Sequence, residues 1–483
     1  MEPITREEYY LAKIAGTYEG NTPEPVTIEE YYLATMAGDY SGNTPQPVTR
    51  LQYYMAKVAG VWGGSIPAPV TRLEYYWAAI ASGEGKVFPP VTREEHFLVL
   101  VADAYSVVLT VVTGNPALLE NSKGNRGLES LTLYGKSTQG STPSPSYPQE
   151  IENAGQSGEI GVQVYGGNLF DKSAAYDLTQ SGGWSASFDG EELKVVGNNI
   201  TIGSIRLFNY KKTLPAGTYT FSISKPLPFE IRIDNYLIKK GDTSATFTSD
   251  NGVSMSHFAV DAEPGATFNE QRFKIMLNAG STALPYELYK PAQTLIIPTS
   301  GGLPGIRVSS GGNYTDADGQ QWVCDEVDFK KGVYVQRIGK RTITSKDVFY
   351  KSGMSTDDVN YFSLGNFSLH IGTIGEKDVL MSNCFVAGIN HGFSAWGKIF
   401  LNSAFDGKVY FSVEAQKYPD EETFKQWAVE NGLMFLYQLT DIIETNLTAK
   451  GLAAYKALRT YSPTTTVIND ASAGMSVGYA KMK

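Results

Sequence analysis

The first hundred residues of the chain repeat one motif five times. A Pro-Ile-Thr or Pro-Val-Thr tripeptide opens each copy, and its prolines are Pro3, Pro25, Pro47, Pro69 and Pro90. The copies follow one another in steps of 22, 22, 22 and 21 residues. Tandem copies of a short unit build length, valency or attachment points, whereas an active site needs different residues that converge once. The pattern therefore favours a structural or binding role.

Each copy contains the start signals of one helix. A threonine stands at the N-cap, and a glutamate or glutamine three residues later completes a capping box. The threonines are Thr5, Thr27, Thr49, Thr71 and Thr92, and their partners are Glu8, Glu30, Gln52, Glu74 and Glu95. An aliphatic residue precedes each threonine, and an aromatic residue follows four positions after it, which predicts a hydrophobic staple. The aliphatic residues are Ile4, Val26, Val48, Val70 and Val91, and the aromatic residues are Tyr9, Tyr31, Tyr53, Tyr75 and His96.

The expected helices are about ten residues long, and isolated helices of this length are marginal in water. Gly16, Gly38 and Gly60 mark their ends in the first three copies. Their apolar faces must therefore pack on neighbouring repeats, on sister chains or on another protein. Two interpretations stay open: a small stacked helical array, or a set of docking units for a larger assembly.

Composition limits the partners of the chain. Its 40 basic and 50 acidic residues give a net charge of −10, and no large Lys/Arg cluster occurs, so no nucleic-acid partner is expected. The longest apolar run, 97–112, contains Asp103 and is too short to span a bilayer, so no membrane insertion is expected. Glu2 and a capped helix follow Met1, which argues against a secretory signal. The two cysteines, Cys324 and Cys384, are expected to be free buried thiols.

The rest of the chain reads as β structure. Ser, Thr, Gly, Val and Tyr dominate after residue 105, which is typical of β-sandwiches and fibrous β proteins. We expect a mainly β fold, a tandem β-sandwich of jelly-roll type, with an N-terminal array of five short helices. The predicted domains are the repeats 1–102, a connector with short strands 103–165, a jelly-roll-like β-sandwich 166–291, and a β-rich domain 292–483 with helices near 420–429 and 448–458. Residues 166–483 are expected to fold without the repeats.

No residues stand at a spacing that indicates catalysis, a metal site or a cofactor, and none of these is predicted. Asp316-Ala317-Asp318-Gly319 shares part of a calcium-loop pattern but fits a hairpin turn better, because the further ligands are not at the required spacing. Scattered carboxylates leave a glycosidase open. Trp184, Tyr236 and Trp396 lie in loop-like sequence and are candidate sugar-binding residues, since aromatic rings offer apolar faces to sugars. The alternative for each is a residue that caps the edge of a core.

Three stretches of the chain resemble minor structural proteins of tailed bacteriophages, especially those of Gram-positive and gut Firmicutes hosts. They are the repeated unit PITREEYYLAKIAG; the segment LTLYGKSTQGSTPSPSYPQEI (131–151) with NLFDKS (168–173) and LNAGSTALPYELYKP (277–291); and VSSGGNYTDADGQQWVCDEVDFKKGVYVQRIG (308–339) with LTAKGLAAYKALRTYSPTTTVINDASAGM (447–475). The resemblance implies a virion fibre, attached to head or tail and homotrimeric. It also implies that the N-terminus anchors the fibre and that the β domains face the host.

The resulting hypothesis is a non-enzymatic phage fibre, assembled in the host cytoplasm as part of the virion. Its repeats, residues 1–102, would dock to other virion proteins, with Thr5, Tyr9, Thr27, Tyr31, Thr49, Tyr53, Thr71, Tyr75 and Thr92 as their defining residues. Its β domains would bind a bacterial surface polysaccharide. Two alternatives are a polysaccharide-degrading tailspike, which turnover of host polysaccharide would reveal, and a purely architectural capsid decoration protein, which would not bind host cells.

Overall fold

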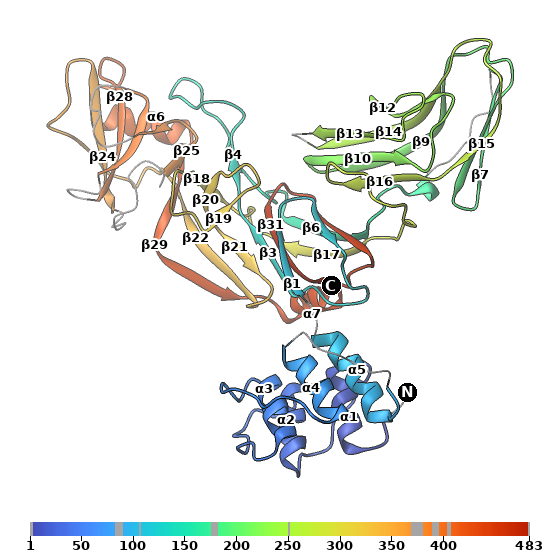
Figure 1. Cartoon of the computed structure of the whole chain (residues 1–483). Helices are drawn as coiled ribbons and strands as arrows, with labels where there is room; N and C mark the ends of the chain where they lie inside the picture. Colours follow the sequence, from blue (N-terminus) through green and yellow to red (C-terminus); the bar gives the residue numbers. More distant parts are fainter. Residues whose placement is uncertain are drawn as a thin grey trace. The chain divides into compact units, whose positions relative to one another are not determined.

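The computed structural model describes residues 3–82, 90–105, 108–174, 182–249, 252–368, 380–388, 396–402 and 407–481. The chain divides into two compact units, one of Met1–Leu109 with Ala480–Lys483 and one of Thr110–Tyr479. Helices form the first unit and antiparallel sheets dominate the second (Figure 1). The expected class, a mainly β protein with five short N-terminal helices, is confirmed.

Each repeat forms one helix over the part of the chain that the structure describes. The helices are α1 (Arg6–Ile14), α2 (Ile28–Met36), α3 (Arg50–Val58), α4 (Arg72–Ser82) and α5 (Arg93–Tyr105). All five begin directly after their threonines, whose hydroxyl oxygens accept from the backbone N–H three residues on at 3.1–3.2 Å. Gly16, Gly38 and Gly60 have φ between 70° and 77°, as a helix-ending glycine requires. The capping prediction is therefore confirmed.

The five helices close into a ring. Each packs against the next along the chain, and α5 packs back against α1. The ring has its own core, in which the second aromatic residue of each repeat is fully buried. These residues are Tyr10, Tyr32, Tyr54, Tyr76 and Phe97. Of the packing partners left open by the sequence, the neighbouring repeats supply the core.

The second unit is built on a central sandwich of two sheets. A seven-stranded sheet has the order β1-β31-β3-β21-β22-β29-β25, and a four-stranded sheet has the order β17-β6-β30-β2. Their strands are β1 (Val108–Thr113), β2 (Ala117–Glu120), β3 (Ser130–Tyr134), β6 (Glu159–Gly166), β17 (Gln293–Pro298), β21 (Glu326–Asp328), β22 (Val333–Thr342), β25 (Leu380–Ser382), β29 (Met434–Asn446), β30 (Thr464–Asn469) and β31 (Gly474–Lys481). Inward residues of both sheets, such as Leu133 and Val162, share one core.

Smaller elements complete this sandwich. A three-stranded sheet has the order β18-β20-β19, and β4 pairs with β5. Their bounds are β4 (Ser137–Thr138), β5 (Glu152–Asn153), β18 (Gly305–Val308), β19 (Tyr314–Thr315) and β20 (Gln321–Cys324). Helix α7 (Ala449–Ala457) lies within the predicted span 448–458, has Thr448 as its N-cap and adds Tyr455 to the core.

The segment 103–165 is not a connector, so this predicted boundary is wrong. Strand β3 lies between β31 and β21, and β6 lies between β17 and β30, so this segment supplies interior strands to both sheets. A chain that begins at residue 166 would lack both strands and would leave the shared core open. Residues 166–483 are therefore not a separate unit of this fold, whereas their folding without the repeats 1–102 stays a prediction.

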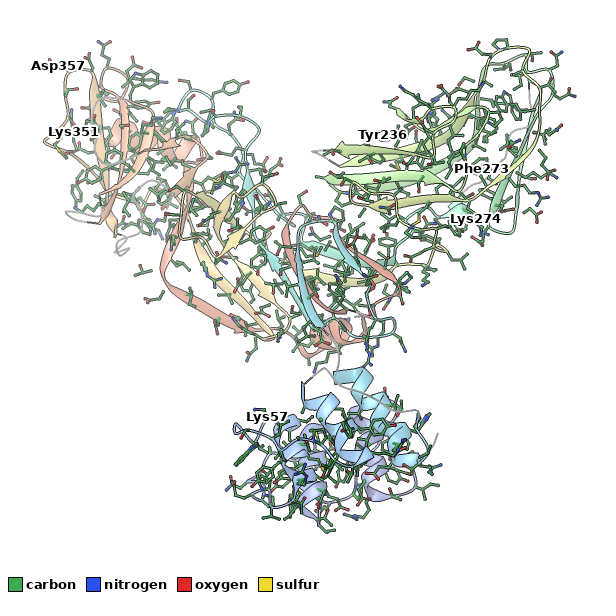
Figure 2. All side chains as sticks on the ribbon, viewed as in Figure 1. Lys57, Tyr236, Phe273, Lys274, Lys351 and Asp357 are labelled. Carbon is green, nitrogen blue, oxygen red and sulfur yellow. The ribbon has the colours of Figure 1, made fainter. Side chains whose placement is uncertain are left out.

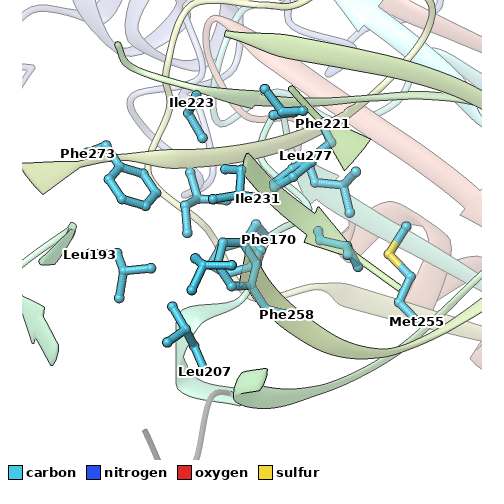
Figure 3. Packing of buried hydrophobic residues seen from close by; sticks show 14 of the residues in the cluster. Phe170, Leu193, Leu207, Phe221, Ile223, Ile231, Met255, Phe258, Phe273 and Leu277 are labelled. Atoms are coloured by element: carbon cyan, nitrogen blue, oxygen red, sulfur yellow. The ribbon is translucent and has the colours of Figure 1, made fainter. Parts of the chain in front are cut away.

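Two segments are inserted into the central sandwich. The first, near the predicted boundaries 166–291, folds around its own core, where Phe170, Phe221, Phe258 and Leu277 meet (Figure 3). Its sheets have the orders β13-β10-β16, β12-β11-β14-β9 and β15-β8-β7. A short 3-10 helix, η1 (Lys172–Ala174), precedes the strands. The strands are β7 (Trp184–Asp189), β8 (Glu192–Gly197), β9 (Ser204–Leu214), β10 (Gly217–Ile223), β11 (Glu230–Ile233), β12 (Tyr236–Ile238), β13 (Ser244–Ser249), β14 (Val253–Asp261), β15 (Phe268–Phe273) and β16 (Ile275–Ala279).

The second insertion divides the domain predicted at 292–483. It lies between β22 and β29 and forms a separate core around Phe411 and Phe424. Its five-stranded sheet has the order β23-β24-β28-β27-β26. The bounds are β23 (Phe349–Lys351), β24 (Val359–Ser368), β26 (Val386–Ala387), β27 (Lys398–Asn402), β28 (Lys408–Glu414) and α6 (Glu421–Glu430), which Asp420 caps.

Candidate docking ring

Ion pairs join the N-terminal ends of the helices. The arginine at the first position of one helix reaches the glutamate at the third position of the next helix. The pairs are Arg6–Glu30 at 2.8 Å, Arg50–Glu74 at 3.3 Å, Arg72–Glu95 at 2.9 Å and Arg93–Glu8 at 2.9 Å. The last pair joins α5 to α1 and closes the ring. Because equivalent helix positions meet at these four seams, which together involve all five helices, the five N-terminal ends lie next to one another on one rim.

The seam between α2 and α3 uses a different contact. Ile28 stands where the other helices have arginine, and Gln52 stands where the others have glutamate. The amide of Gln52 donates to the carboxylate of Glu29 at 2.7 Å. A glutamate at position 52 would be a buried carboxylate without an arginine, which is costly. The two exceptions in the repeat therefore compensate each other across one seam.

The third residue of each helix is a buried acceptor. These side chains are only 2–6% exposed, and each accepts the backbone N–H of the aliphatic residue before the N-cap at 2.7–2.9 Å. The guanidinium of Arg93 lowers the pKa of Glu8. The guanidinium of Arg72, helped by the Val91 N–H, lowers the pKa of Glu95 to about 2. These carboxylates are therefore charged in the folded ring at neutral pH.

The expected hydrophobic staple does not form. The aliphatic residues Ile4, Val26, Val48, Val70 and Val91 are 69–76% exposed. In the first three repeats, the aromatic residue expected to cover them packs edge-on against an aromatic residue after the helix. The pairs are Tyr9–Tyr18, Tyr31–Tyr40 and Tyr53–Trp62, with ring centroids 5.0–5.2 Å apart. The rim therefore carries one exposed aliphatic side chain per repeat.

The buried tyrosines tie each repeat to the loop that follows it. The hydroxyls of Tyr10, Tyr32 and Tyr54 donate to the carbonyls of Pro23, Pro45 and Pro67, which lie just before the next copies. The fifth repeat has Phe97 instead and is followed by β1, not by a sixth loop. The loss of the hydroxyl in the last copy matches the loss of its acceptor.

The three candidate sugar-binding residues do not form one site. Trp184 is a core residue at 2% exposure: its ring packs against Phe229 and Phe268, and its N–H donates to the Ile202 carbonyl at 2.9 Å. Its faces are therefore closed to a ligand, as the core-edge alternative expects. Tyr236 lies at one edge of its sheet (Figure 2) and stacks one face of its ring on Phe247, with the two ring centroids 3.7 Å apart.

Trp396 is the one of the three that offers a large accessible surface. It is 56% exposed and lies just before β27, in the second insertion. Trp184 and Tyr236 lie on strands β7 and β12 of the first insertion, whereas Trp396 lies in the second insertion. Trp396 thus remains a candidate contact, while a joint site of the three is not supported by their placement.

The second unit also contains a polar cleft that the sequence did not predict. It has a volume of about 850 Å³ and is lined in part by Lys136, Arg307, Asp316 and Trp322. Asp316 accepts from the Trp322 indole at 2.9 Å and pairs with Lys136 at 3.1 Å. The charges of Lys136 and Asp316 therefore satisfy each other. The backbone carbonyl of Asp316 also closes the expected hairpin turn, because it accepts the Gly319 N–H at 3.0 Å.

Comparisons with protein-family models, curated proteins and solved structures returned no match to this chain. Among the residues that the structure describes, no three His, Cys, Asp or Glu side chains gather as a metal site would require, and no helix is long and apolar enough to cross a membrane. Cys324 and Cys384 are both buried free thiols, as expected. Two of the four histidines of the chain, His370 and His391, lie outside the residues that the structure describes.

Proposed function

We propose that this chain is a virion fibre protein that docks through its N-terminal ring and presents its β domains to the host surface. The observation that carries the proposal is the rim of the ring: five equivalent aliphatic side chains are 69–76% exposed, although the repeats have a complete core of their own. A module whose internal packing is already satisfied, and which still exposes one apolar group per repeat, is suited to bind another protein.

The ring makes docking and display separable. Its buried tyrosines and ion pairs are internal to residues 3–105, and the sandwich cores of the second unit do not include them. For the β domains we propose contact with a surface polysaccharide, with Trp396 as one contact. A homotrimer remains part of the proposal, but the ring does not require sister chains to bury its helix faces.

The test is incorporation into virions. We expect mass spectrometry and immunogold labelling to find the full chain in purified virions, and a chain that begins at residue 106 to be absent from them. That variant keeps every strand of the central sandwich, so a folded but unincorporated protein would support ring docking. Incorporation of the shortened chain at the level of the full chain would overturn it.

Host contact has its own measurement. The full chain should bind intact host cells, and Trp396→Ala should weaken this binding without a loss of stability. Tyr147→Ala, which removes another exposed aromatic at 71% exposure, is the matched control. Release of soluble sugar from host polysaccharide would instead identify a tailspike, and absence of cell binding would favour a purely architectural protein.

A further inference from the structure

The rim holds its five aliphatic residues in a fixed position. The backbone N–H groups of Ile4, Val26, Val48, Val70 and Val91 all donate to the buried third side chain of their own helices. The backbone is therefore tied down while the side chain points into solvent. β-Branched side chains have few rotamers, so little conformational entropy remains to be lost when a partner binds them.

Local structure does not account for these residues. An extended residue before an N-cap needs at most a β-branched side chain, and threonine would supply one with a hydroxyl in place of one exposed methyl group. The repeats do change at other positions, as Ile28, Gln52 and His96 show, yet this position is purely aliphatic in all five. Single exposed aliphatic residues are ordinary on protein surfaces, but five at equivalent places on one closed rim are not.

The charges of the rim are largely satisfied within the ring. Four arginines at the first helix position are 40–45% exposed, and each is paired with a buried glutamate of the next repeat. The second helix position varies between Glu7, Glu29 and Glu94 and the apolar Leu51 and Leu73. The apolar feature that all five repeats offer a partner in common is thus the aliphatic side chain, next to an exposed N-cap threonine.

Resting on the proposed docking role of the ring, we infer that the rim binds an assembly of five identical subunits arranged about a rotation axis. Each subunit takes one of the five aliphatic side chains into a small apolar pocket. The same Arg–Glu contact relates neighbouring helices at four of the seams, and Gln52–Glu29 takes its place between α2 and α3, so the five side chains occupy similar places in their repeats. A partner without this symmetry would meet five different environments and would give no reason for the same residue type in each.

Site-specific photo-crosslinking in assembled virions tests the inference. A photoreactive leucine analogue replaces Ile4, Val26, Val48, Val70 or Val91, one position at a time, in the full chain. These positions are mostly exposed, so the ring should remain folded, which hydrogen exchange of α1–α5 verifies. Val61, an aliphatic residue 43% exposed after the C-terminal end of α3, carries the same analogue as the matched control.

We expect all five rim positions to crosslink to the same peptide of one partner protein, and Val61 to give no such crosslink. Five different peptides, or crosslinks from only one or two repeats, would overturn the five-fold partner while leaving docking by the ring intact. Crosslinks to this chain itself, or none at all from chains present in virions, would overturn the rim as the docking surface. Absence of the chain from virions would instead overturn the proposed function.

Discussion

The seam between α2 and α3 allows the logic of the ring to be tested by a double-mutant cycle. Gln52 is buried, accepts the N–H groups of Val48 and Thr49 at 2.9 and 3.1 Å, and donates to Glu29 at 2.7 Å. Gln52→Glu keeps the acceptor but turns the donor into an anionic oxygen beside a second carboxylate. Ile28→Arg supplies the missing guanidinium in the position that Arg6 and Arg50 occupy in their own helices.

The magnitude follows from two effects. Gln52→Glu loses a hydrogen bond to a charged group, about 1.5–3 kcal/mol. It also brings two like charges close together, about 4 kcal/mol at 4 Å for a pair near the surface, part of which Glu29 relieves by turning into solvent. We therefore expect a loss of about 2–4 kcal/mol for the single variant. Ile28→Arg alone should change stability by less than about 1 kcal/mol, and in the double variant it should restore about 1–3 kcal/mol.

Hydrogen exchange of the full chain measures this, because the amides of α2 and α3 report the opening free energy of the ring itself. Gln46→Glu, at an exposed position, is the matched control for the added charge. The loss in Gln52→Glu should also shrink below about pH 4, since the introduced carboxyl group, once protonated, can donate to Glu29 again. A single variant as stable as the control, or a coupling energy under about 0.5 kcal/mol, would refute the compensation across this seam.

Three further outcomes are expected. Thr27→Ala should destabilise α2 by about 0.5–2 kcal/mol, seen as faster exchange of 28–36, because it removes the acceptor for an N-terminal N–H; unchanged exchange would contradict a working cap. The ring should lose stability as pH falls from about 4.5 towards 2, because the pKa of Glu95 is depressed to about 2 and its pairing contributes only while it is ionised; exchange measured at pH 5 and pH 3 checks this, and an equally protected ring at both would contradict it. Trp184→Ala should destabilise the first insertion by about 3–5 kcal/mol, because it removes a side chain at 2% exposure, whereas Trp396→Ala should stay within about 0.5 kcal/mol; denaturant unfolding that ranks the two the other way would refute these assignments.

The local features of the chain could be predicted because their causes lie within a few residues. A capping box joins positions three apart, so the starts of α1–α5 followed directly from Thr5 and its four equivalents. The starts of α6 and α7 lie within the predicted spans 420–429 and 448–458. Turn residues likewise located the hairpin at Asp316–Gly319. In each case the backbone hydrogen bond and the side chain that satisfies it are encoded in one short segment.

The domain boundaries failed because sheet pairing is not local. Strand β3 pairs with β31, so Leu131 lies opposite Val477 on the neighbouring strand, although almost the whole sequence of the second unit separates the two residues. The alternation of buried and exposed residues in β3 shows that it is a strand with one buried face, but it does not show which strand covers that face. The Pro/Ser-rich loop after it suggested a linker, although the structure uses it between two strands of one domain.

Trp184 is closed to a ligand for a related reason. The sequence around Trp184 is rich in Gly and Ser, which is typical of loops, yet Trp184 begins β7 and its indole is covered by Phe229 and Phe268 from other strands. Exposure of an aromatic ring depends on what distant segments place over it. Only Trp396, with no such cover among the described residues, retains the accessibility that the hypothesis required.

Closure of the ring, by contrast, was encoded in a signal that the sequence reading overlooked. The second repeat is the one that lacks the first-position arginine, and the third repeat is the one that lacks the third-position glutamate. Such a matched pair of exceptions means that each repeat recognises its successor through these two positions. The same rule then applies to the last copy, whose Arg93 needs a glutamate and finds it in Glu8 of the first. In an open array the terminal repeats expose unpaired faces and require special caps, whereas here the first and fifth copies cap each other. The number of repeats is therefore part of the fold, and the count of five that the rim presents to a partner is fixed by the same contacts that hold the ring together.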